Sequence, residues 1–264
     1  MKKLLFALLA FAAGTVVLHG APAVKQIVKC GDYEITLVSH HFWNLNSVDY
    51  AGINLCRPQS FFGNVARFKC GWVGTGHLEN KIGEKELNVK FFADGKEFVP
   101  NGKTVAVNDF EMKKSSVLLD LKIDYTLKFS AGKIVEYAKV TVLRDTELNM
   151  LYLFMHPWCA LFEYGVYQYA DGSEAKIVFD ASNLKKIIEK RGVVKVTYFA
   201  PKEQLAATTT LKTIKGVPGG KEAFLFWNRG VDRKLYFKPV GKQKLNAGVA
   251  FEYELTTVIE KKIK

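Results

Sequence analysis

Hydrophobic and polar residues alternate along much of this chain, and the alternation predicts β-strands. In the clearest run, every second residue from Val117 to Phe129 is apolar, and charged or polar residues fill the positions between Leu119 and Phe129. This pattern is typical of a strand with one face in the core and the other in solvent. Residues 134–143 alternate in the same way after a short turn. We expect these strands and the one that follows them to form an antiparallel meander.

The segment 148–169 is expected to hold the centre of the sheet. Its first part is apolar at successive positions, which predicts a strand buried on both faces. Period-two alternation would place Met150, Tyr152 and Phe154 on one face, and Leu151, Leu153 and Met155 on the other. Pro157 has no N–H for a ladder, so it is predicted to end the strand or to bulge it. A second strand follows, with Glu163, Tyr167 and Tyr169 on one face.

The remaining pattern predicts many short strands and almost no helix. Residues 24–38 fit two strands about a turn at Gly31-Asp32, 48–64 a long loop, and 245–259 a last strand that closes the sheet. Residues 183–191 fit either one short helix or a hairpin that turns at Arg191-Gly192. About fifteen strands in total predict an all-β fold, a large antiparallel β-sandwich, in a single domain over residues 24–264.

The first 23 residues have the pattern of a signal peptide. Lys2 and Lys3 precede an apolar run, and Ala21-Pro22-Ala23 provides the small residues of a cleavage site. A membrane anchor is the alternative, but the run is short for a span, and no later segment is long and apolar enough to cross a bilayer. We therefore expect cleavage near Ala23 and a secreted or periplasmic protein without a transmembrane segment in its mature chain.

The charge of the chain narrows the class of partner. The 38 Lys and Arg residues against 26 Asp and Glu give a net charge of +12, and removal of Lys2 and Lys3 with the leader leaves +10. A basic exported protein attracts acidic polysaccharides or an anionic envelope, although a generic basic surface is an equal alternative. The chain has no motif of a nucleic-acid-binding fold, so nucleic acid is not an expected partner.

The cysteines form an even set, which permits disulfides in an exported chain. These are Cys30, Cys56, Cys70 and Cys159. They could pair in three ways, or they could stay as buried thiols. Neither a C-x-x-C pair nor an HExxH motif occurs in the sequence, so no metal and no cofactor is expected.

A glycine-rich segment, 65–79, provides the first candidate site. If it stays extended, Thr75, His77 and Glu79 share one face and Trp72 lies on the other. Polar residues beside glycines suit a groove lined for sugar, and a histidine can move protons near neutral pH. An ordinary exposed strand edge is the alternative. The segment lacks the glycine-lysine-serine or threonine ending of a phosphate loop.

The second group of candidates surrounds the end of the apolar strand. His156 interrupts apolar sequence and could be a proton donor or a core histidine. Trp158, Tyr164 and Tyr167 could stack on sugar rings or belong to the core. Glu163 could serve as a general acid or base, or it could be an exposed surface residue. Asn228 and Arg229 fall in a predicted loop, where the arginine could clamp a uronate or sulfate in bidentate fashion.

Two short segments carry a resemblance to a known family. His156-Pro157-Trp158 at the end of a core strand is similar to the histidine-proline-aromatic turn of galactose mutarotases, and Leu245-Asn246-Ala247-Gly248 before a long strand is similar to their closing segment. The resemblance implies the β-supersandwich fold, which also occurs as a domain in polysaccharide lyases and glycosidases. Mutarotases carry a catalytic glutamate late in the chain, and the corresponding segment here, 224–229, has none.

The leading hypothesis is a carbohydrate-active protein that acts on or binds an acidic oligo- or polysaccharide. If it is an enzyme, we expect β-elimination, in which Arg229 neutralises the uronate carboxylate, His77 or His156 removes the proton alpha to it, and a tyrosine protonates the leaving oxygen. The alternatives are a non-catalytic glycan-binding or envelope-associated module, a mutarotase- or epimerase-like enzyme, and a sandwich without a sugar ligand. The first scheme predicts that both histidines lie in one pocket on a concave sheet face, beside Trp72 or Trp158, with Arg229 at the rim.

Overall fold

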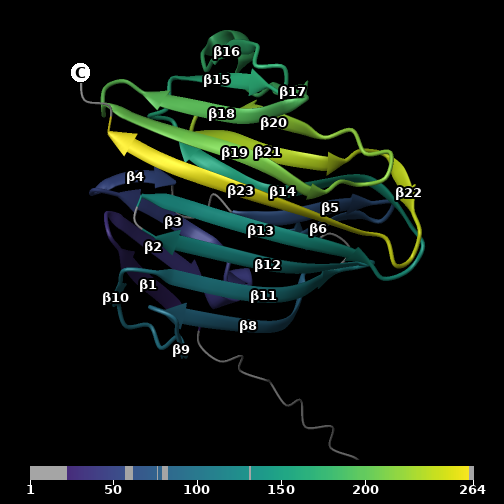
Figure 1. Cartoon of the computed structure of the whole chain (residues 1–264), viewed down its shortest axis with the longest axis horizontal. Coiled ribbons are helices and arrows are strands. Elements are labelled where there is room, and N and C mark those ends of the chain that lie inside the picture. Colours follow the sequence, from purple (N-terminus) through teal and green to yellow (C-terminus); the bar gives the residue numbers. More distant parts are fainter. Residues whose placement is uncertain (1–22, 57–61, 76, 79–82, 131, 262–264) are drawn as a thin grey trace, which may run out of the picture.

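The protein folds into two large β-sheets that pack face to face (Figure 1). The computed structural model describes residues 23–56, 62–75, 77–78, 83–130 and 132–261. Within these residues it contains 23 strands and two 3₁₀ turns, η1 (Ser39–His41) and η3 (Ala181–Asn183). The prediction of an all-β antiparallel sandwich is confirmed, with more and shorter strands than expected.

Sheet A has 13 strands. Its main path runs β10 (Val105–Val107), β1 (Lys25–Cys30), β2 (Tyr33–Val38), β3 (Leu45–Tyr50), β4 (Ile53–Cys56), β14 (Thr146–Cys159), β21 (Asp232–Val240), β20 (Ala223–Asn228) and β17 (Ile187–Arg191). Beside this path, β14 also pairs with β22 (Gln243–Leu245) and β5 (Gly63–Phe68), which continues through β6 (Gly71–Gly74) to β7 (His77–Leu78). All its pairs are antiparallel except β1 with β10.

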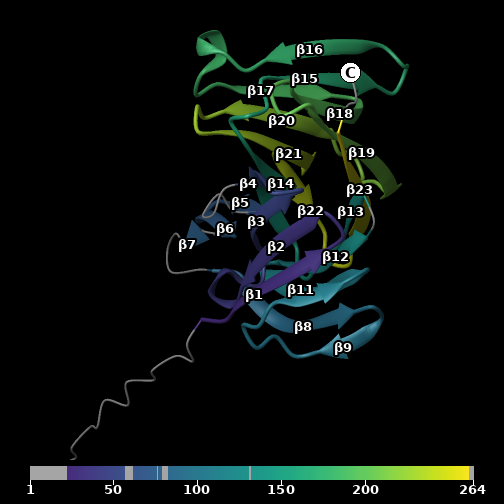
Figure 2. The same ribbon diagram turned by 90° about the vertical axis from the view of Figure 1, so that its left-hand side faces the viewer.

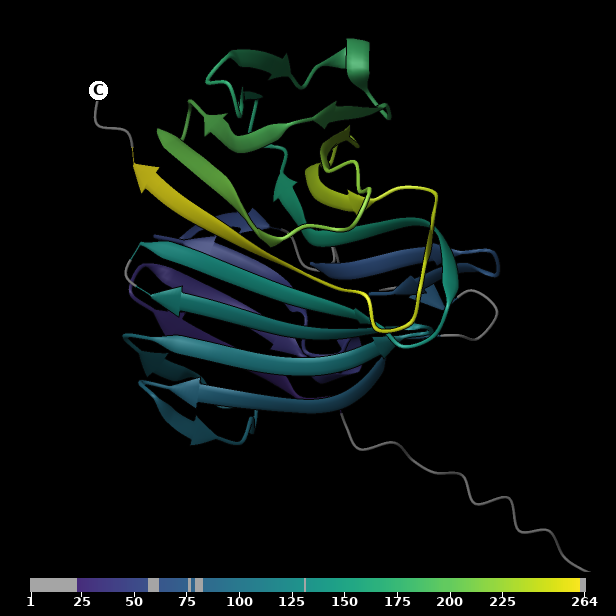
Figure 3. The same cartoon turned by 45° about the vertical axis from the view of Figure 1, so that its right-hand side comes forward.

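Sheet B has 10 strands, seen in front in Figure 3. Their order is β16 (Glu174–Val178), β15 (Tyr164–Tyr169), β18 (Val193–Ala200), β19 (Leu205–Lys215), β23 (Ala250–Lys261), β13 (Lys133–Val142), β12 (Leu121–Ser130), β11 (Phe110–Leu118), β8 (Lys85–Ala93) and β9 (Lys96–Phe98). The long strands β11, β12, β13 and β23 each bury every second residue, as the alternating pattern predicts.

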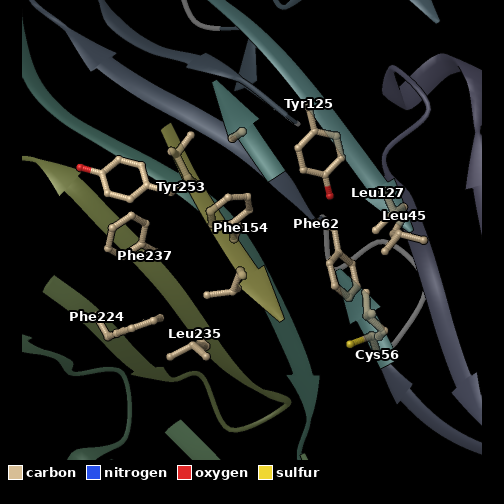
Figure 4. Packing of buried hydrophobic residues seen from close by; sticks show 14 of the residues in the cluster. Leu45, Cys56, Phe62, Tyr125, Leu127, Phe154, Phe224, Leu235, Phe237 and Tyr253 are labelled. Atoms are coloured by element: carbon tan, nitrogen blue, oxygen red, sulfur yellow. The ribbon is translucent and has the colours of Figure 1, made fainter. Parts of the chain in front are cut away.

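The main hydrophobic core lies between the sheets and draws residues from both. Phe237 of β21 and Tyr253 of β23 meet there edge to face, with ring centres 4.8 Å apart (Figure 4). Their strands belong to different sheets, so this contact marks the interface that holds the sandwich together. Aromatic pairs in this geometry add stability beyond the area they bury.

Strand β14 lies at the centre of sheet A, between β4 and β5 on one side and β21 on the other. Its register shifts between Leu153 and His156, and Phe154 has a left-handed φ of 53°. This bulge changes the alternation, so Phe154 joins the main core and Met155 lies on the opposite face with Tyr152. The predicted assignment of residues to the two faces of the strand is therefore wrong after Leu153. Contrary to the prediction, the strand neither ends nor bulges at Pro157 but runs through it in regular register to Cys159.

The predicted meander is partly wrong. The chain turns at Leu119 (φ 55°), so residues 117–129 belong to two strands, β11 and β12, rather than one. Strand β14 follows β13 in sequence but crosses into sheet A, where it has no ladder with β13. The last strand, β23, lies between β13 and β19 and does not close the sheet.

In three further regions the structure either differs from the prediction, decides between its alternatives or confirms it. The predicted loop 48–64 contains the end of β3, all of β4 and the start of β5, while residues 57–61 lie outside the described chain. Residues 183–191 form neither helix nor hairpin, because β17 pairs with β20 in sheet A whereas β18 pairs in sheet B. The predicted pair of strands about Gly31-Asp32 is confirmed as β1 and β2.

None of the four cysteines forms a disulfide, and only Cys70 is exposed. The Cys30 thiol donates to the Phe129 carbonyl oxygen at 3.3 Å and to that of Asn108 at 3.0 Å.

Among the described residues, none of the helices is long and apolar enough to cross a membrane.

Candidate functional site

A row of aromatic and cationic side chains crosses the outer face of sheet A. It is hereafter the aromatic–cationic row, and consists of Arg67, Trp72, Tyr152, Tyr236, Lys234, Trp227 and Arg229. A second hydrophobic cluster around Tyr152 and Tyr236 contains residues of sheet A alone. In β21, Leu235 and Phe237 belong to the main core whereas Tyr236 does not, so this cluster lies on the face turned away from sheet B.

Ring contacts make the row continuous from strand to strand. Trp72 stacks on Tyr152 with ring centres 5.6 Å apart, and Tyr152 stacks on Tyr236 at 5.0 Å. The Lys234 Nζ lies 5.7 Å from the ring centre of Tyr236 and 5.8 Å from that of Trp227. With neighbouring strands about 4.8 Å apart, the four intervals from β6 to β20 make the row roughly 19 Å long.

Each end of the row carries an arginine over a tryptophan. The Arg67 Cζ lies 5.5 Å from the ring centre of Trp72, and the Arg229 Cζ lies 5.3 Å from that of Trp227. Both rings are half-buried, whereas Tyr152 and Tyr236 are 8% and 5% exposed. The tryptophans therefore present ring surface to a ligand, and the tyrosines form the floor between them.

Burial controls the protonation of the central groups. Desolvation lowers the pKa of Lys234 from 10.5 to about 8; nearby Asp232 opposes this shift and Arg229 adds to it. Desolvation also raises the pKa of Tyr152 to about 12 and that of Tyr236 further. Both phenols therefore stay protonated at neutral pH, while the lysine loses its proton under mildly alkaline conditions.

Two carboxylates limit the positive charge near the row. Asp232 Oδ1 lies 3.7 Å from Arg229 Nε, and the Asp232 side chain is 1% exposed. Glu189 pairs with Lys238 and, at 3.4 Å, with Arg191. Arg67, Lys234 and Arg229 leave the row itself cationic.

His156 lies in the core and not on this face. Its Nε2 bonds to Glu136 Oε2 of β13, and both side chains are 2% exposed. Tyr125 donates its hydroxyl to the other Glu136 oxygen at 2.6 Å. The prediction of a pocket for His77 and His156 with Arg229 at its rim is therefore wrong for His156 and Arg229, which lie on opposite faces of sheet A; the side chain of His77 lies outside the described residues.

Four other candidates are buried structural residues. Trp158 and Tyr167 belong to the main core. Thr75 is 2% exposed and accepts a hydrogen bond from Asn44 Nδ2 at 2.9 Å. Asn228 donates to Asn183 Oδ1 at 2.7 Å and accepts from Arg233 at 2.8 Å, so it joins the end of η3 to the start of β21.

The remaining candidates are separate from the row or lie outside the described residues. Glu163 is exposed and pairs with Lys202 at 3.5 Å. Tyr164 stacks on Phe199 at 4.8 Å beneath Lys176, in sheet B. The backbone of His77 pairs with Gly74, but its side chain, like all of Glu79, is not described. Of the predicted residues, the structure thus brings only Trp72 and Arg229 into one row.

Five members of the row were missed from the sequence, although some signals for them exist. Lys234, Tyr236 and Lys238 alternate with Leu235 and Phe237, which marks one polar and aromatic face of β21. Tyr152 could not be assigned to this face because both faces of β14 are apolar. Glu136 could also be recognised from the sequence as unusual, because it occupies one of the buried alternating positions of β13, between Ile134 and Ala138.

The depressed pKa of Lys234 has a consequence for stability. Since the pKa is about 8 in the folded chain and 10.5 ordinarily, the folded state binds fewer protons between these values, so wild-type stability rises with pH there. We expect Lys234→Met to raise the free energy of unfolding by about 1–3 kcal/mol at pH 7, with a gain that shrinks towards pH 10. Urea denaturation at several pH values measures it.

Lys212→Met is the matched control, because Lys212 is 68% exposed and lies 3.9 Å from Glu254. It should change the free energy of unfolding by less than about 0.5 kcal/mol at every pH. A Lys234→Met protein less stable than the wild type at pH 7 would contradict the burial argument.

No group of three or more His, Cys, Asp or Glu side chains in the described residues is arranged to hold a metal ion. The row presents aromatic surfaces, hydrogen-bond donors and fixed positive charge.

Comparisons with known proteins place the fold. No protein-family model and no curated protein matches the sequence. Among solved structures, the Slr1438 protein from Synechocystis sp. PCC 6803 matches with a TM-score of 0.56 and 5% identity, over 88% of this chain and 93% of that one. A galactose mutarotase-like protein from Lactobacillus casei matches with a TM-score of 0.53 and 9% identity, over 89% of this chain and all of that one.

A larger enzyme contains the same architecture as a part. The GH36 α-galactosidase AgaA from Geobacillus stearothermophilus matches with a TM-score of 0.51 and 8% identity, over 90% of this chain but 40% of that one. These identities establish the fold alone: the protein has the architecture of galactose mutarotase-like structures, as the sequence resemblance implied.

Proposed function

We propose that this protein binds an anionic oligosaccharide along the aromatic–cationic row. The observation that carries the proposal is the continuous row of rings and cations across five strands. Sugar C–H faces pack on aromatic rings, and arginine or lysine pairs with a carboxylate or sulfate. The row provides both kinds of contact at two tryptophans, each under an arginine.

The fold adds support from proteins of the same architecture. Solved structures with this fold include a putative aldose 1-epimerase from Escherichia coli K12 and the α-galactosidase AgaA, whose names refer to sugar substrates. Binding of a charged sugar would depend on the charges and rings of this chain and not on the fold.

Calorimetric titration with oligosaccharides of equal length tests the proposal. We expect uronate or sulfated oligosaccharides to bind and neutral ones to bind at least about tenfold more weakly, because Arg67, Lys234 and Arg229 lose their partners. Trp72→Leu and Trp227→Leu should each weaken binding about 5–50-fold, since each removes a stacking surface and a cation–π platform.

Tyr164→Leu is the matched control, because it also removes a ring beneath a lysine, but in sheet B. It should leave the affinity unchanged. Equal binding of charged and neutral oligosaccharides, or undiminished binding by both tryptophan variants, would contradict the proposal.

A second candidate function is β-elimination on a bound uronate, favoured by the lowered pKa of Lys234 beside two protonated tyrosines. In this scheme the neutral Lys234 amine takes the proton alpha to the carboxylate, and the electron pair of that C–H bond forms the C=C bond as the glycosidic C–O bond at the beta carbon breaks. Tyr236 gives a proton to the leaving oxygen. Arg229 neutralises the carboxylate, while the buried His156 has no part.

The two candidates differ in whether the sugar changes. Elimination leaves an unsaturated, ultraviolet-absorbing product, which should accumulate faster as pH rises through 8 and disappear in Lys234→Met. Binding without such a product from any uronate polysaccharide would leave the protein a glycan-binding module.

A further inference from the structure

An exposed aliphatic corner lies at one end of the molecule. Three of the exposed large hydrophobic side chains in the described residues lie there on neighbouring segments, and together they are hereafter the aliphatic corner: Leu184, Ile187 and Val231, at 44%, 51% and 52% exposure. They lie at the end with β16 and β17, opposite β8 and β9 (Figure 2). Single exposed aliphatic residues are ordinary, but a group of them marks an interaction surface.

Asn228 holds the two loops of this corner together. Leu184 forms a bridge with Asn228, whose carbonyl oxygen accepts from Lys185 N at 2.6 Å. A Cβ built on Gly230 would lie 3.3 Å from Leu184 Cδ1, so the β20–β21 turn contacts the loop before β17. The buried Asn228 therefore presents the sequence 184–187, Leu-Lys-Lys-Ile, beside 229–231, Arg-Gly-Val, with all seven residues exposed.

Cations surround the aliphatic side chains. Lys185 and Lys186 lie between Leu184 and Ile187, Arg229 adjoins the corner on the β20–β21 turn, and Arg191 ends β17. Three acids face the same region, and one of them, Asp232, pairs with Arg229 at 3.7 Å. The Asp180 carboxylate accepts from Ser182 N and Oγ at 2.8 and 2.6 Å, and Glu189 is paired with Lys238 and Arg191. The cations therefore exceed the acids at this end.

We propose that the aliphatic corner docks the protein on an anionic lipid surface. Aliphatic side chains flanked by lysines enter the boundary between headgroups and acyl chains while the cations bind anionic headgroups. A protein partner fits less well, because Leu and Val are under-represented at interface hot spots. Self-pairing of β17 in antiparallel register would also place Glu189 opposite its own copy, which is unfavourable. Arg229 belongs to both the corner and the row, and Ile187 pairs with Trp227, so the two surfaces adjoin; docking on lipid does not require a bound glycan.

Flotation of the full chain with lipid vesicles tests the inference. We expect binding to phosphatidylglycerol–phosphatidylcholine vesicles to exceed binding to pure phosphatidylcholine vesicles by at least about tenfold, and to fall at high salt. The paired substitution Ile187→Glu with Val231→Glu should reduce the partition coefficient at least about tenfold. Lys185→Gln with Lys186→Gln should reduce it on anionic vesicles only.

Val99→Glu is the matched control, because Val99 is 83% exposed and follows β9 at the other end of the molecule. It should bind vesicles as the wild type does, and circular dichroism should show all variants folded. Absence of binding to anionic vesicles, or binding that survives the paired glutamates, would overturn the inference. A dimer in sedimentation velocity that the paired glutamates dissociate, without vesicle binding, would assign the corner to a second copy and overturn it too.

Discussion

Replacing Lys114 with methionine is expected to lower the free energy of unfolding by about 3–5 kcal/mol. Lys114 extends from the inner face of β11 and is 1% exposed, with Glu84 at 2.9 Å and 3% exposed. Its other ammonium hydrogens reach Asn44 Oδ1 at 2.8 Å and the Phe42 carbonyl oxygen at 3.0 Å. Removal of the lysine leaves a buried carboxylate without its cation and two acceptors without a donor, which is why the loss is large.

Urea denaturation of Lys114→Met against Lys122→Met measures this effect. Lys122 also carries a carboxylate partner, Asp124 at 3.0 Å, but the two side chains are 37% and 39% exposed. The exposed pair should contribute less than about 1 kcal/mol, because water and salt screen it. Equal losses in the two variants would show that burial of the Lys114 pair has no energetic consequence.

Replacing Glu136 with leucine is expected to cost about 2–4 kcal/mol of stability. Glu136 accepts the Tyr125 hydroxyl and bonds to His156 Nε2 between the two sheets, so leucine leaves two buried polar groups without their partner. Desolvation and the neighbouring Glu136 raise the pKa of Tyr125 well above its usual value, so its hydroxyl keeps a proton that needs an acceptor. Glu136→Gln retains an acceptor and should cost less.

Glu252→Leu is the control for this experiment. Glu252 accepts the Tyr137 hydroxyl at 2.7 Å and pairs with Lys139 at 3.3 Å, but it lies on the solvent face of sheet B, 22% exposed. Its loss should cost less than about 1 kcal/mol. A Glu136→Leu protein as stable as wild type would mean that the network is not needed to join the sheets, and thermal unfolding of both variants decides the question.

Much of the candidate site could not be predicted, and the reason lies in β14. Tyr152 reaches the aromatic–cationic row, whereas His156 enters the core, because the bulge at Phe154 changes which face each later residue occupies. Period-two reasoning cannot locate such a bulge in a segment that is apolar on both faces. The sequence marks His156 as unusual and leaves both a catalytic and a core position open, and the bulge decides for the core.

The alternation of polar and apolar residues is a local property, and it determined what depends on local structure. The sequence alone predicted the all-β class, the amphipathic strands of sheet B and the hairpin of β1 and β2. This was possible because the alternation within a strand shows which of its faces is buried. Only the tertiary structure decided that β14 leaves β13 for sheet A, that β23 enters between β13 and β19, and that seven separated residues form one row. Those outcomes depend on pairing between strands that are distant in sequence. The local pattern fits several partners for each strand equally well, and the free energy of packing the two sheets together determines which partner it has.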